Sequence, residues 1–338
     1  MDKRAYCRTP RTPPHCGCTY HGPVLVALAG GVGAARLLSG LVRVVDPGEV
    51  TAVVNTGDDL ELHGLHISPD VDTIVYTLAG LHNRSTGWGV ATESWTVMTE
   101  LERLGGQAWF RLGDRDLATH LYRTQRLREG AALHEVTSEI ARARGVGVRV
   151  LPMSDDPVRT RVVLDEDTEG APAGTEVSFQ HYFVGLRHGV AVRAVRFDGA
   201  TAARPAPGVL EAIGAAETVV VCPSNPVVSI GPLLAVPGMR EALAARRAQV
   251  VAVSPIVAGA ALKGPADRLL AELGHESSAV GVARLHSEWV GTLVIDEQDA
   301  RLKDAVEAEG VRAVVAPTIM ASPQLAASLA TVVLDAAR

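Results

Sequence analysis

The chain has 338 residues, of which 47% are hydrophobic, a length that suits one large or two modest folded domains. Its formal net charge is −6 and it has no block of lysine and arginine, which argues against a protein that binds nucleic-acid duplexes. No apolar run reaches the roughly 18 to 20 residues that cross a bilayer, and the N-terminus lacks the apolar centre of a signal peptide. We therefore predict a cytoplasmic protein whose partners are small molecules, with neither a nucleic-acid polymer nor a membrane.

The N-terminal segment is rich in proline and arginine, and residues 1–22 are predicted to be a disordered extension. It holds three of the four cysteines, Cys7, Cys16 and Cys18, with two histidines beside them. A zinc site stays open as an alternative, although the spacing matches no usual zinc pattern. Residues 23–338 are predicted to form a single domain.

From residue 23 onward, short β-branched runs alternate with longer amphipathic stretches, which is typical of a parallel sheet covered by helices. Four apolar runs are expected as buried strands, each opening into a loop that contains Gly, Ser, Asn or Asp: residues 24–29, 51–55, 218–223 and 250–255. Ligands of open α/β sheets bind beyond the carboxyl ends of the strands. We therefore expect a Rossmann-like α/β core in which four strand-end loops form one composite site.

The middle of the chain has a different pattern. Residues 91–145 read as helices that end at glycines, and residues 148–199 alternate apolar and polar residues between turn signals. We expect an insertion at about residues 91–199 that is helical first and then forms a smaller mixed or antiparallel β region.

The glycine-rich sequence GGVGAAR, residues 30–36, follows a strand and begins a helix, so its backbone N–H groups could hold a phosphate. The alternative is a tight turn that needs glycine for steric reasons. A nicotinamide fingerprint would have a small residue in place of Arg36 and an acid in place of Asn55, and no Gly-Lys-Ser/Thr follows as in a P-loop. A phosphate contact through this loop is the favoured interpretation.

Four aspartates lie within and just after the second strand-end loop: Asp58, Asp59, Asp70 and Asp72. Acids at helix starts can be ordinary caps, and this is the better interpretation of Asp70, which follows a proline. Two acid pairs beside a phosphate site also suit a hard cation such as Mg²⁺. His63 and His66 could add imidazole ligands, but a surface or supporting role is favoured for each.

A second polar cluster lies at the start of a predicted helix: Arg111, Asp114, Arg115, Asp116 and His120. A solvated network of ion pairs, with Asp114 as the cap, would account for several of these residues. Arg115 is the predicted functional member, because a guanidinium beside a metal-bound diphosphate neutralises charge in a transition state.

The sequence contains no GxSxG elbow, CxxC pair or HExxH helix. Phosphoryl transfer needs little covalent chemistry from the protein, because positioning and charge stabilisation by a metal and cations suffice. The aspartates and arginines described above could bind a metal and stabilise charge in this way.

Taken in order, the motifs closely resemble the 2-phospho-L-lactate transferase family of coenzyme F-420 biosynthesis, from about Val24 to near the C-terminus. The segments that carry the resemblance are GGVGAARLLSGL, AVVNTGDD, SPDVDTIVYTL, LGDRDLATHL, LPMSDDPVRT, PSNPVVSIGPLLAVPGMR and VSPIVAGAALKGPAD.

The resemblance implies a reaction in which a ribityl hydroxyl of 7,8-didemethyl-8-hydroxy-5-deazariboflavin attacks the phosphorus that bears a small organic acid in a guanosine-diphospho conjugate. GMP leaves and a phosphodiester forms. The resemblance also implies a divalent metal, usually Mg²⁺, a Rossmann-like core with an added smaller region, and often a homodimer. The acid is a lactyl or an enolpyruvyl group, and one sequence does not show which, because pocket contacts of that size are worth only about 1 to 3 kcal/mol.

The resemblance also implies roles for residues. Asp58 and Asp72 match acidic positions at the metal, with Asp59 and Asp70 second. Asp58, Asp72 and Arg115 are the predicted catalytic residues. The predicted substrate-binding residues are Gly31, Gly33, Asn55, Asp72, Arg115, Ser224, Asn225 and Ser254.

Two alternatives stay open from the sequence. One is a sugar-nucleotide-binding regulatory protein of the same superfamily that has no turnover; the segments LGDRDLATH and MSDDP argue against it. The other is a nicotinamide-dependent oxidoreductase, which the missing ribose-binding acid argues against.

Overall fold

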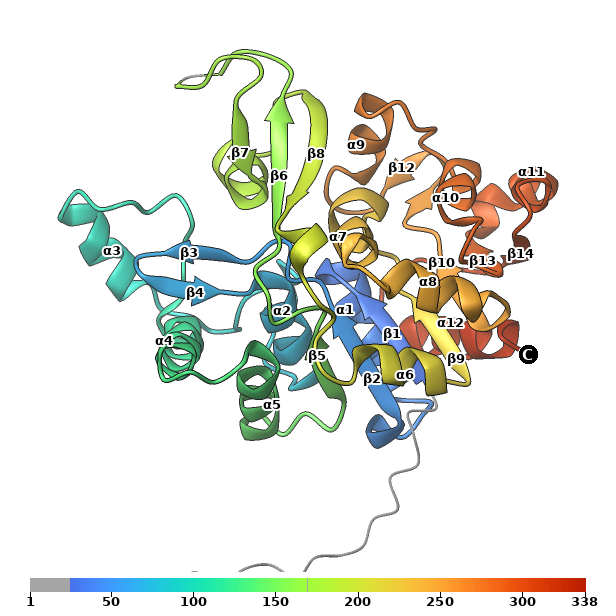
Figure 1. The fold of residues 1–338 in the computed structure, drawn as a ribbon, viewed down its shortest axis with the longest axis horizontal. Coiled ribbons are helices and arrows are strands. Elements are labelled where there is room, and N and C mark those ends of the chain that lie inside the picture. Colours follow the sequence, from blue (N-terminus) through green and yellow to red (C-terminus); the bar gives the residue numbers. More distant parts are fainter. Residues whose placement is uncertain (1–24, 169) are drawn as a thin grey trace, which may run out of the picture.

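The structure is a computed structural model and describes residues 25–168 and 170–338. The predicted N-terminal extension, with its cysteines, lies outside the described residues. Within them, a seven-stranded sheet has the order β14-β13-β10-β9-β1-β2-β5, and every neighbouring pair is parallel (Figure 1). Its strands are β1 (Leu25–Ala29), β2 (Val50–Val54), β5 (Arg149–Pro152), β9 (Thr218–Val221), β10 (Val250–Val253), β13 (Thr292–Ile295) and β14 (Arg312–Val315).

The central strand β1 shows why the sheet is covered on both faces. Its side chains alternate between the two faces, so that Val26 and Leu28 belong to one apolar cluster while Leu25, Ala27 and Ala29 belong to the other. All five residues are fully buried. A strand of continuous apolar character is what a two-sided core requires.

Each face of the sheet has its own set of helices. One face is covered by α1 (Gly31–Leu41), α2 (Pro69–Leu78), α5 (Leu133–Ala143) and α12 (Pro323–Ala336). The other is covered by α6 (Val209–Ala215), α7 (Gly231–Ala235), α8 (Met239–Ala245), α9 (Ala266–Glu272), α10 (Ala279–His286) and α11 (Lys303–Ala308). The predicted Rossmann-like fold is thereby confirmed.

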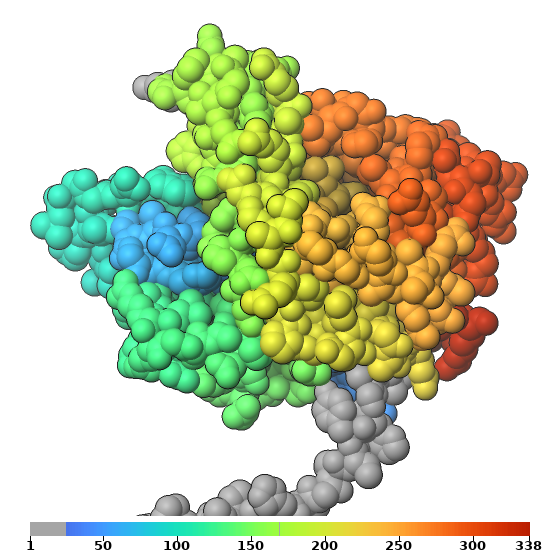
Figure 2. All heavy atoms as spheres, in the orientation of Figure 1, coloured from blue at the N-terminus to red at the C-terminus, as the bar shows by residue number. Residues whose placement is uncertain are grey.

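The insertion projects from the first half of this core. It comprises α3 (Thr96–Arg103), α4 (Asp114–Arg128) and an antiparallel sheet of order β7-β6-β8, formed by β6 (Arg159–Leu164), β7 (Glu176–Ser178) and β8 (Val192–Asp198). A hairpin of β3 (Leu60–Leu62) and β4 (Leu65–Ile67) precedes it. In Figure 2 the β6–β8 sheet and α3 stand out from the body on either side of this hairpin.

One predicted boundary is wrong. Residues 149–152, which the sequence analysis assigned to the inserted β region, form β5 and pair in parallel with β2 at the edge of the main sheet. Three of these four residues are buried. The pattern of a short apolar run does not show whether the strand belongs to an insertion or to the main sheet. The parallel pairing with β2 places this strand in the main sheet.

The remaining elements are short. They are β11 (Ile256–Val257) and β12 (Ala260–Ala261), the 3₁₀ turns Pro47–Glu49, Ala200–Ala202, Arg247–Gln249 and Glu297–Leu302, and the π-helical turns His181–Gly185 and Pro226–Ile230. Among the described residues, no single helix has the length and composition to cross a membrane. The segments Pro226–Ala235 and Met239–Ala245 pass such a test only as a pair, and they are bent by 95°.

Gly40 is where α1 lies closest to α12. A Cβ atom on Gly40 would come within 2.2 Å of the carbonyl oxygen of Ala326, and backbone cannot move aside as a flexible side chain can. We predict that Gly40→Ala lowers the free energy of unfolding by about 1–3 kcal/mol. Gly214→Ala is the matched control, because this helical glycine has open space around it, and it should raise stability by about 0.5–1 kcal/mol.

Urea unfolding followed by circular dichroism measures both variants. Equal stability of Gly40→Ala and the unsubstituted protein would contradict the close approach of the two helices.

Candidate functional site

A cavity of about 400 Å³ lies at the carboxyl ends of the central strands. Its walls come from the loops after β1, β2 and β9, from α2 and α4, and from the segment around Lys263. The convergence of strand-end loops on one site, expected from the sequence, is therefore present in the structure. The loop directly after β10 is the exception, because only its later residues reach the cavity.

The glycine loop forms one wall of this cavity. Gly31 has a φ of +74°, a conformation that side chains rarely adopt, and a Cβ atom on Gly33 would lie 2.2 Å from the carbonyl oxygen of Pro223. Both glycines are thus required by the turn and by the neighbouring strand-end loop. Next to them, Ser224 donates its hydroxyl to the carbonyl oxygen of Gly30, and Asn225 caps the turn that follows.

Asp70 connects this wall to the acidic segment. Its Oδ1 accepts a hydrogen bond from the backbone N–H of Gly31 at 2.9 Å, and its Oδ2 accepts one from Asn55 Nδ2 at 2.9 Å. Burial raises the pKa of Asp70 to about 6, and the two hydrogen bonds limit the rise. Asn55 is fully buried and does not line the cavity, so the structure places it behind Asp70.

Asp58 has the least compensated charge in the site. It is only 6% exposed, and its Oδ1 has no hydrogen-bond partner. Burial, followed by the negative charge of Asp70, raises the pKa of Asp58 well above its ordinary value. A buried carboxylate oxygen without a donor that faces a cavity suits a cation with hard oxygen ligands.

The Asp59 side chain contacts Ser68 and His66 and does not line the larger cavity. Its Oδ2 accepts a hydrogen bond from Ser68 Oγ at 2.9 Å and lies 3.0 Å from His66 Nε2, while its Oδ1 has no partner. It lines a second cavity, of about 310 Å³, between the β3 hairpin and the β6–β8 sheet. Asp58 lines both cavities and marks the place where they meet.

Asp72 is paired with an arginine that the sequence analysis did not single out. Arg123 is completely buried and binds both carboxylate oxygens of Asp72 through its Nη1 and Nη2 atoms. Each carboxylate oxygen has more than one lone pair, so Asp72 keeps acceptor capacity toward the cavity that it lines. The pair places a guanidinium beside a carboxylate that is only 4% exposed.

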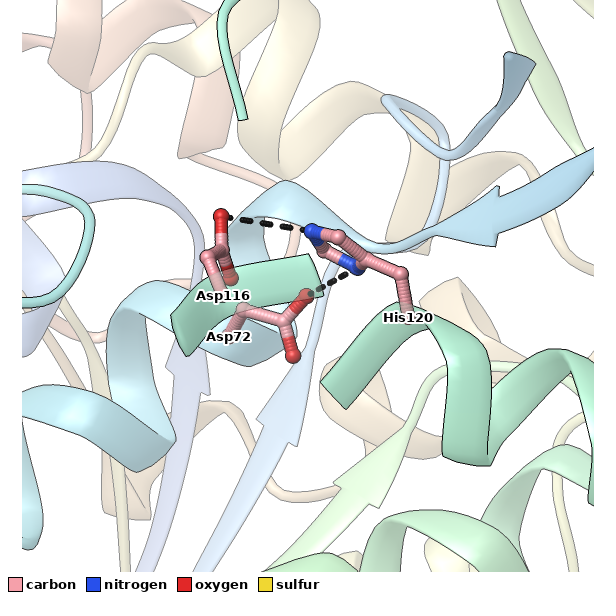
Figure 3. Close-up of side chains that lie close together, drawn as sticks. All are labelled: Asp72, Asp116 and His120. Atoms are coloured by element: carbon pink, nitrogen blue, oxygen red, sulfur yellow. Dashed lines mark ion pairs between the residues drawn. The ribbon is translucent and has the colours of Figure 1, made fainter. Parts of the chain in front are cut away.

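Asp72, Asp116 and His120 form a group whose potential ligand atoms lie within 4.8 Å of one another (Figure 3). His120 Nδ1 lies 3.7 Å from Asp72 Oδ2, and His120 Nε2 lies 3.2 Å from Asp116 Oδ2. Such a buried Asp-Asp-His group could hold a metal ion. All three side chains line the larger cavity.

Besides Asn55 and Asp59, two further predicted residues do not line this cavity. Arg115 is exposed, and its Nη1 donates to the carbonyl oxygen of Ala91 at 2.9 Å. The Ser254 hydroxyl donates to the carbonyl oxygen of Ile256 at 2.9 Å and stabilises a turn. Their predicted roles in catalysis and substrate binding stay predictions. Arg111, which belongs to the same polar cluster of the sequence as Arg115, does line the cavity.

Aromatic side chains form another part of the cavity wall. The rings of Phe179 and Phe183 stack with centroids 5.4 Å apart and an angle of 17° between their planes. Trp88 and Phe110 line the same cavity, and 52% of the Trp88 surface is exposed. A cavity lined by both aromatic and polar side chains suits a ligand that has a flat ring and a polar chain.

A family comparison matches almost all of the described chain. Residues 25–326 match the family described as 2-phospho-L-lactate transferase CofD. The chain belongs to this family. It is accordingly a transferase of phosphate-containing groups, and the predicted recognition and enzyme class are confirmed.

Curated relatives of the family are similar over nearly their full lengths. The phosphoenolpyruvate transferase of Streptomyces griseus is 46% identical over 315 residues, which cover 93% of this chain and 98% of the relative. That of Kitasatospora aureofaciens is 46% identical, covering 90% and 95%. That of Mycolicibacterium smegmatis is 41% identical, covering 93% and 98%.

A solved structure shares the fold. A UPF0052 family protein of Bacillus halodurans superposes with a TM-score of 0.57 at 18% identity, covering 92% of this chain and 98% of its own. The similarity supports the architecture described above.

We predict that Asp58→Asn stabilises the metal-free protein at pH 7 by on the order of 1–3 kcal/mol, because it removes a buried, uncompensated charge. The folded-state pKa of Asp58 is raised, so its contribution to stability is fully present below the unfolded pKa of about 3.9 and is lost as the pH rises through the folded pKa. The gain from the substitution should therefore shrink toward pH 4.

Thermal unfolding with and without Mg²⁺ completes the measurement. Mg²⁺ should raise the midpoint of the unsubstituted protein and leave Asp58→Asn unchanged. Asp335→Asn, at an exposed carboxylate, is the control and should respond to Mg²⁺ as the unsubstituted protein does. A Mg²⁺ response that survives Asp58→Asn would contradict a cation at Asp58.

Proposed function

We propose that the protein transfers a phosphoenolpyruvyl group from a guanosine-diphospho conjugate to the ribityl hydroxyl of 7,8-didemethyl-8-hydroxy-5-deazariboflavin, with Mg²⁺, in coenzyme F-420 biosynthesis. The observation that carries this proposal is a single cavity whose lining combines the glycine loop, stacked aromatic rings and a buried carboxylate with one oxygen that has no hydrogen-bond partner. The enolpyruvyl donor is chosen over the lactyl one because the relatives described above are phosphoenolpyruvate transferases.

Different residues of the cavity lining are proposed to bind the two substrates. The helix that begins at Gly31 directs its amino end toward the cavity, and Lys263 lines the same side, which suits the donor diphosphate. Phe179 and Phe183 offer flat surfaces to the deazaflavin ring. The ribityl chain would then extend from the aromatic wall toward the acids.

Asp58 is the proposed first ligand of the metal, with Asp72 through its remaining lone pairs and Asp59 and Asp70 as support. Mg²⁺ bound there would neutralise charge on the diphosphate and acidify the attacking hydroxyl. That hydroxyl oxygen forms a bond to the phosphorus that bears the enolpyruvyl group, the bond from this phosphorus to the GMP oxygen breaks, and the hydroxyl proton passes to Asp58 or Asp72.

The assay uses the full chain with the deazaflavin, the enolpyruvyl donor and Mg²⁺, and measures release of GMP. We expect Asp58→Asn to lower turnover by about 100-fold or more, since it removes a charge that acts on the transition state. Asp335→Asn should keep full activity. Absence of GMP release with any three-carbon donor would refute the proposal, and tight binding of a sugar nucleotide instead would favour the regulatory alternative.

The donor is identified by competition. With equal amounts of enolpyruvyl, lactyl and phosphoglyceryl donors, mass spectrometry of the product should show mainly the dehydro, enolpyruvyl form. A product with mainly a lactyl group would retain the transferase and correct the donor. The predicted homodimer stays a prediction that light scattering can check.

A further inference from the structure

His120 has one ring nitrogen whose hydrogen-bonding capacity is unused. The side chain is 1% exposed and lines the larger cavity. Its Nε2 lies within ion-pair distance of Asp116 Oδ2, at 3.2 Å, and has no hydrogen bond of good geometry to any described residue. A buried polar atom without a partner that borders a cavity indicates a ligand at that point.

Arg123 determines where the proton of His120 resides. Its Nη1 lies 3.3 Å from His120 Nδ1, and a guanidinium has donors only. This contact is a hydrogen bond only when His120 Nδ1 is the acceptor and carries no proton. The ring proton is then on Nε2, which lies toward Asp116.

This tautomer affects the use of the Asp-Asp-His group. A metal bound at Nε2 would require the proton on Nδ1, where it would face the N–H of Arg123. A metal at Nδ1 would lie against the guanidinium itself. His120 is thus arranged as a hydrogen-bond donor, while the two carboxylates remain able to bind a cation.

The donor at His120 stands beside an acceptor. Asp116 Oδ1 is fixed by the hydroxyl of Tyr76 at 2.6 Å, which leaves Oδ2 toward His120 Nε2. A hydroxyl group both accepts and donates, so it can bind to the two side chains at once. A phosphate oxygen, which is negatively charged, would be repelled by Asp116.

We propose that His120 and Asp116 bind a hydroxyl group of the acceptor's polyol chain, and that Arg123 is a positioning residue that fixes the His120 tautomer. This inference rests on the proposed function for the identity of the acceptor. It assigns substrate recognition to a part of α4 that neither the predicted metal set nor Arg115 covers.

The first test measures binding of the deazaflavin, by its fluorescence, in the absence of donor. His120→Gln places an amide N–H near the position of Nε2, whereas His120→Asn places one near Nδ1. We expect the dissociation constant to change less than threefold in His120→Gln and to rise about tenfold in His120→Asn. Equal affinity of His120→Asn and the unsubstituted protein would overturn the inference.

A deazaflavin that carries a methyl group in place of the ribityl chain separates the two proposals. It should bind the unsubstituted protein and His120→Asn equally weakly. If the unsubstituted protein binds neither compound, the proposed function fails. If it binds the ribityl compound but His120→Asn weakens both compounds equally, only the hydroxyl contact fails.

Nitrogen-15 NMR of the unsubstituted protein reads the His120 tautomer directly, without a measurement of affinity. The His120 ring, assigned by comparison with His120→Gln, should show a protonated Nε2 and an unprotonated Nδ1. The reverse pattern would overturn the role of Arg123. Titration with Mn²⁺, followed by electron paramagnetic resonance, should give the same affinity in His120→Asn, and a large loss of affinity would show that His120 is a metal ligand instead.

Discussion

The arrangement of the site depends on the carboxylate of Asp70. Its two oxygens bind the backbone of the glycine loop after β1 and the side chain of Asn55 after β2, while its own backbone begins α2. Three segments that are far apart in the sequence are therefore held by one buried side chain. The remaining acids owe their positions to this connection, since Asp58 follows Asn55 and Asp72 follows Asp70 by only a few residues.

The buried carboxylates differ in how their charge is compensated. Arg123 balances Asp72 with a full positive charge, whereas Asp59 and Asp70 receive hydrogen bonds from neutral groups and His66. Asp58 and Asp59 each have one oxygen without a donor, and of these two residues only Asp58 lines the larger cavity. Burying charge without a partner is unfavourable, so this difference points to the place where a ligand supplies the compensation.

Much of the fold could be predicted because the strands of a doubly covered sheet are apolar along their whole length. The four predicted strands lie within one or two residues of β1, β2, β9 and β10. The boundaries of the insertion were harder, since nothing in the run at residues 149–152 indicates which sheet it joins.

The site residues likewise fall into a group that could be predicted from the sequence and a group that could not. The glycines and acids follow strands directly, so chain order alone places them at the sheet edge, and Asp58, Asp70 and Asp72 do line the cavity. Residues on α4 depend on rotation about the helix. Asp116, His120 and Arg123 have the spacing of one helix face, while Arg115 is turned away by about 100°. The spacing of four and then three residues from Asp116 places Arg123 on the same helix face as His120, so the sequence alone could have identified Arg123.

The strand order has a consequence for how the molecule is made. β1 lies between β2 and β9, so one edge of the first strand, at Leu25, has no partner until Thr218 has been synthesised. The loops after β1 and β9, which face each other across Gly33 and Pro223, cannot meet earlier. Contacts between distant parts of a chain form slowly. An N-terminal fragment can therefore hold all four acids and still have no cavity, and the ability to bind ligand should be among the last properties that the chain acquires during synthesis and folding.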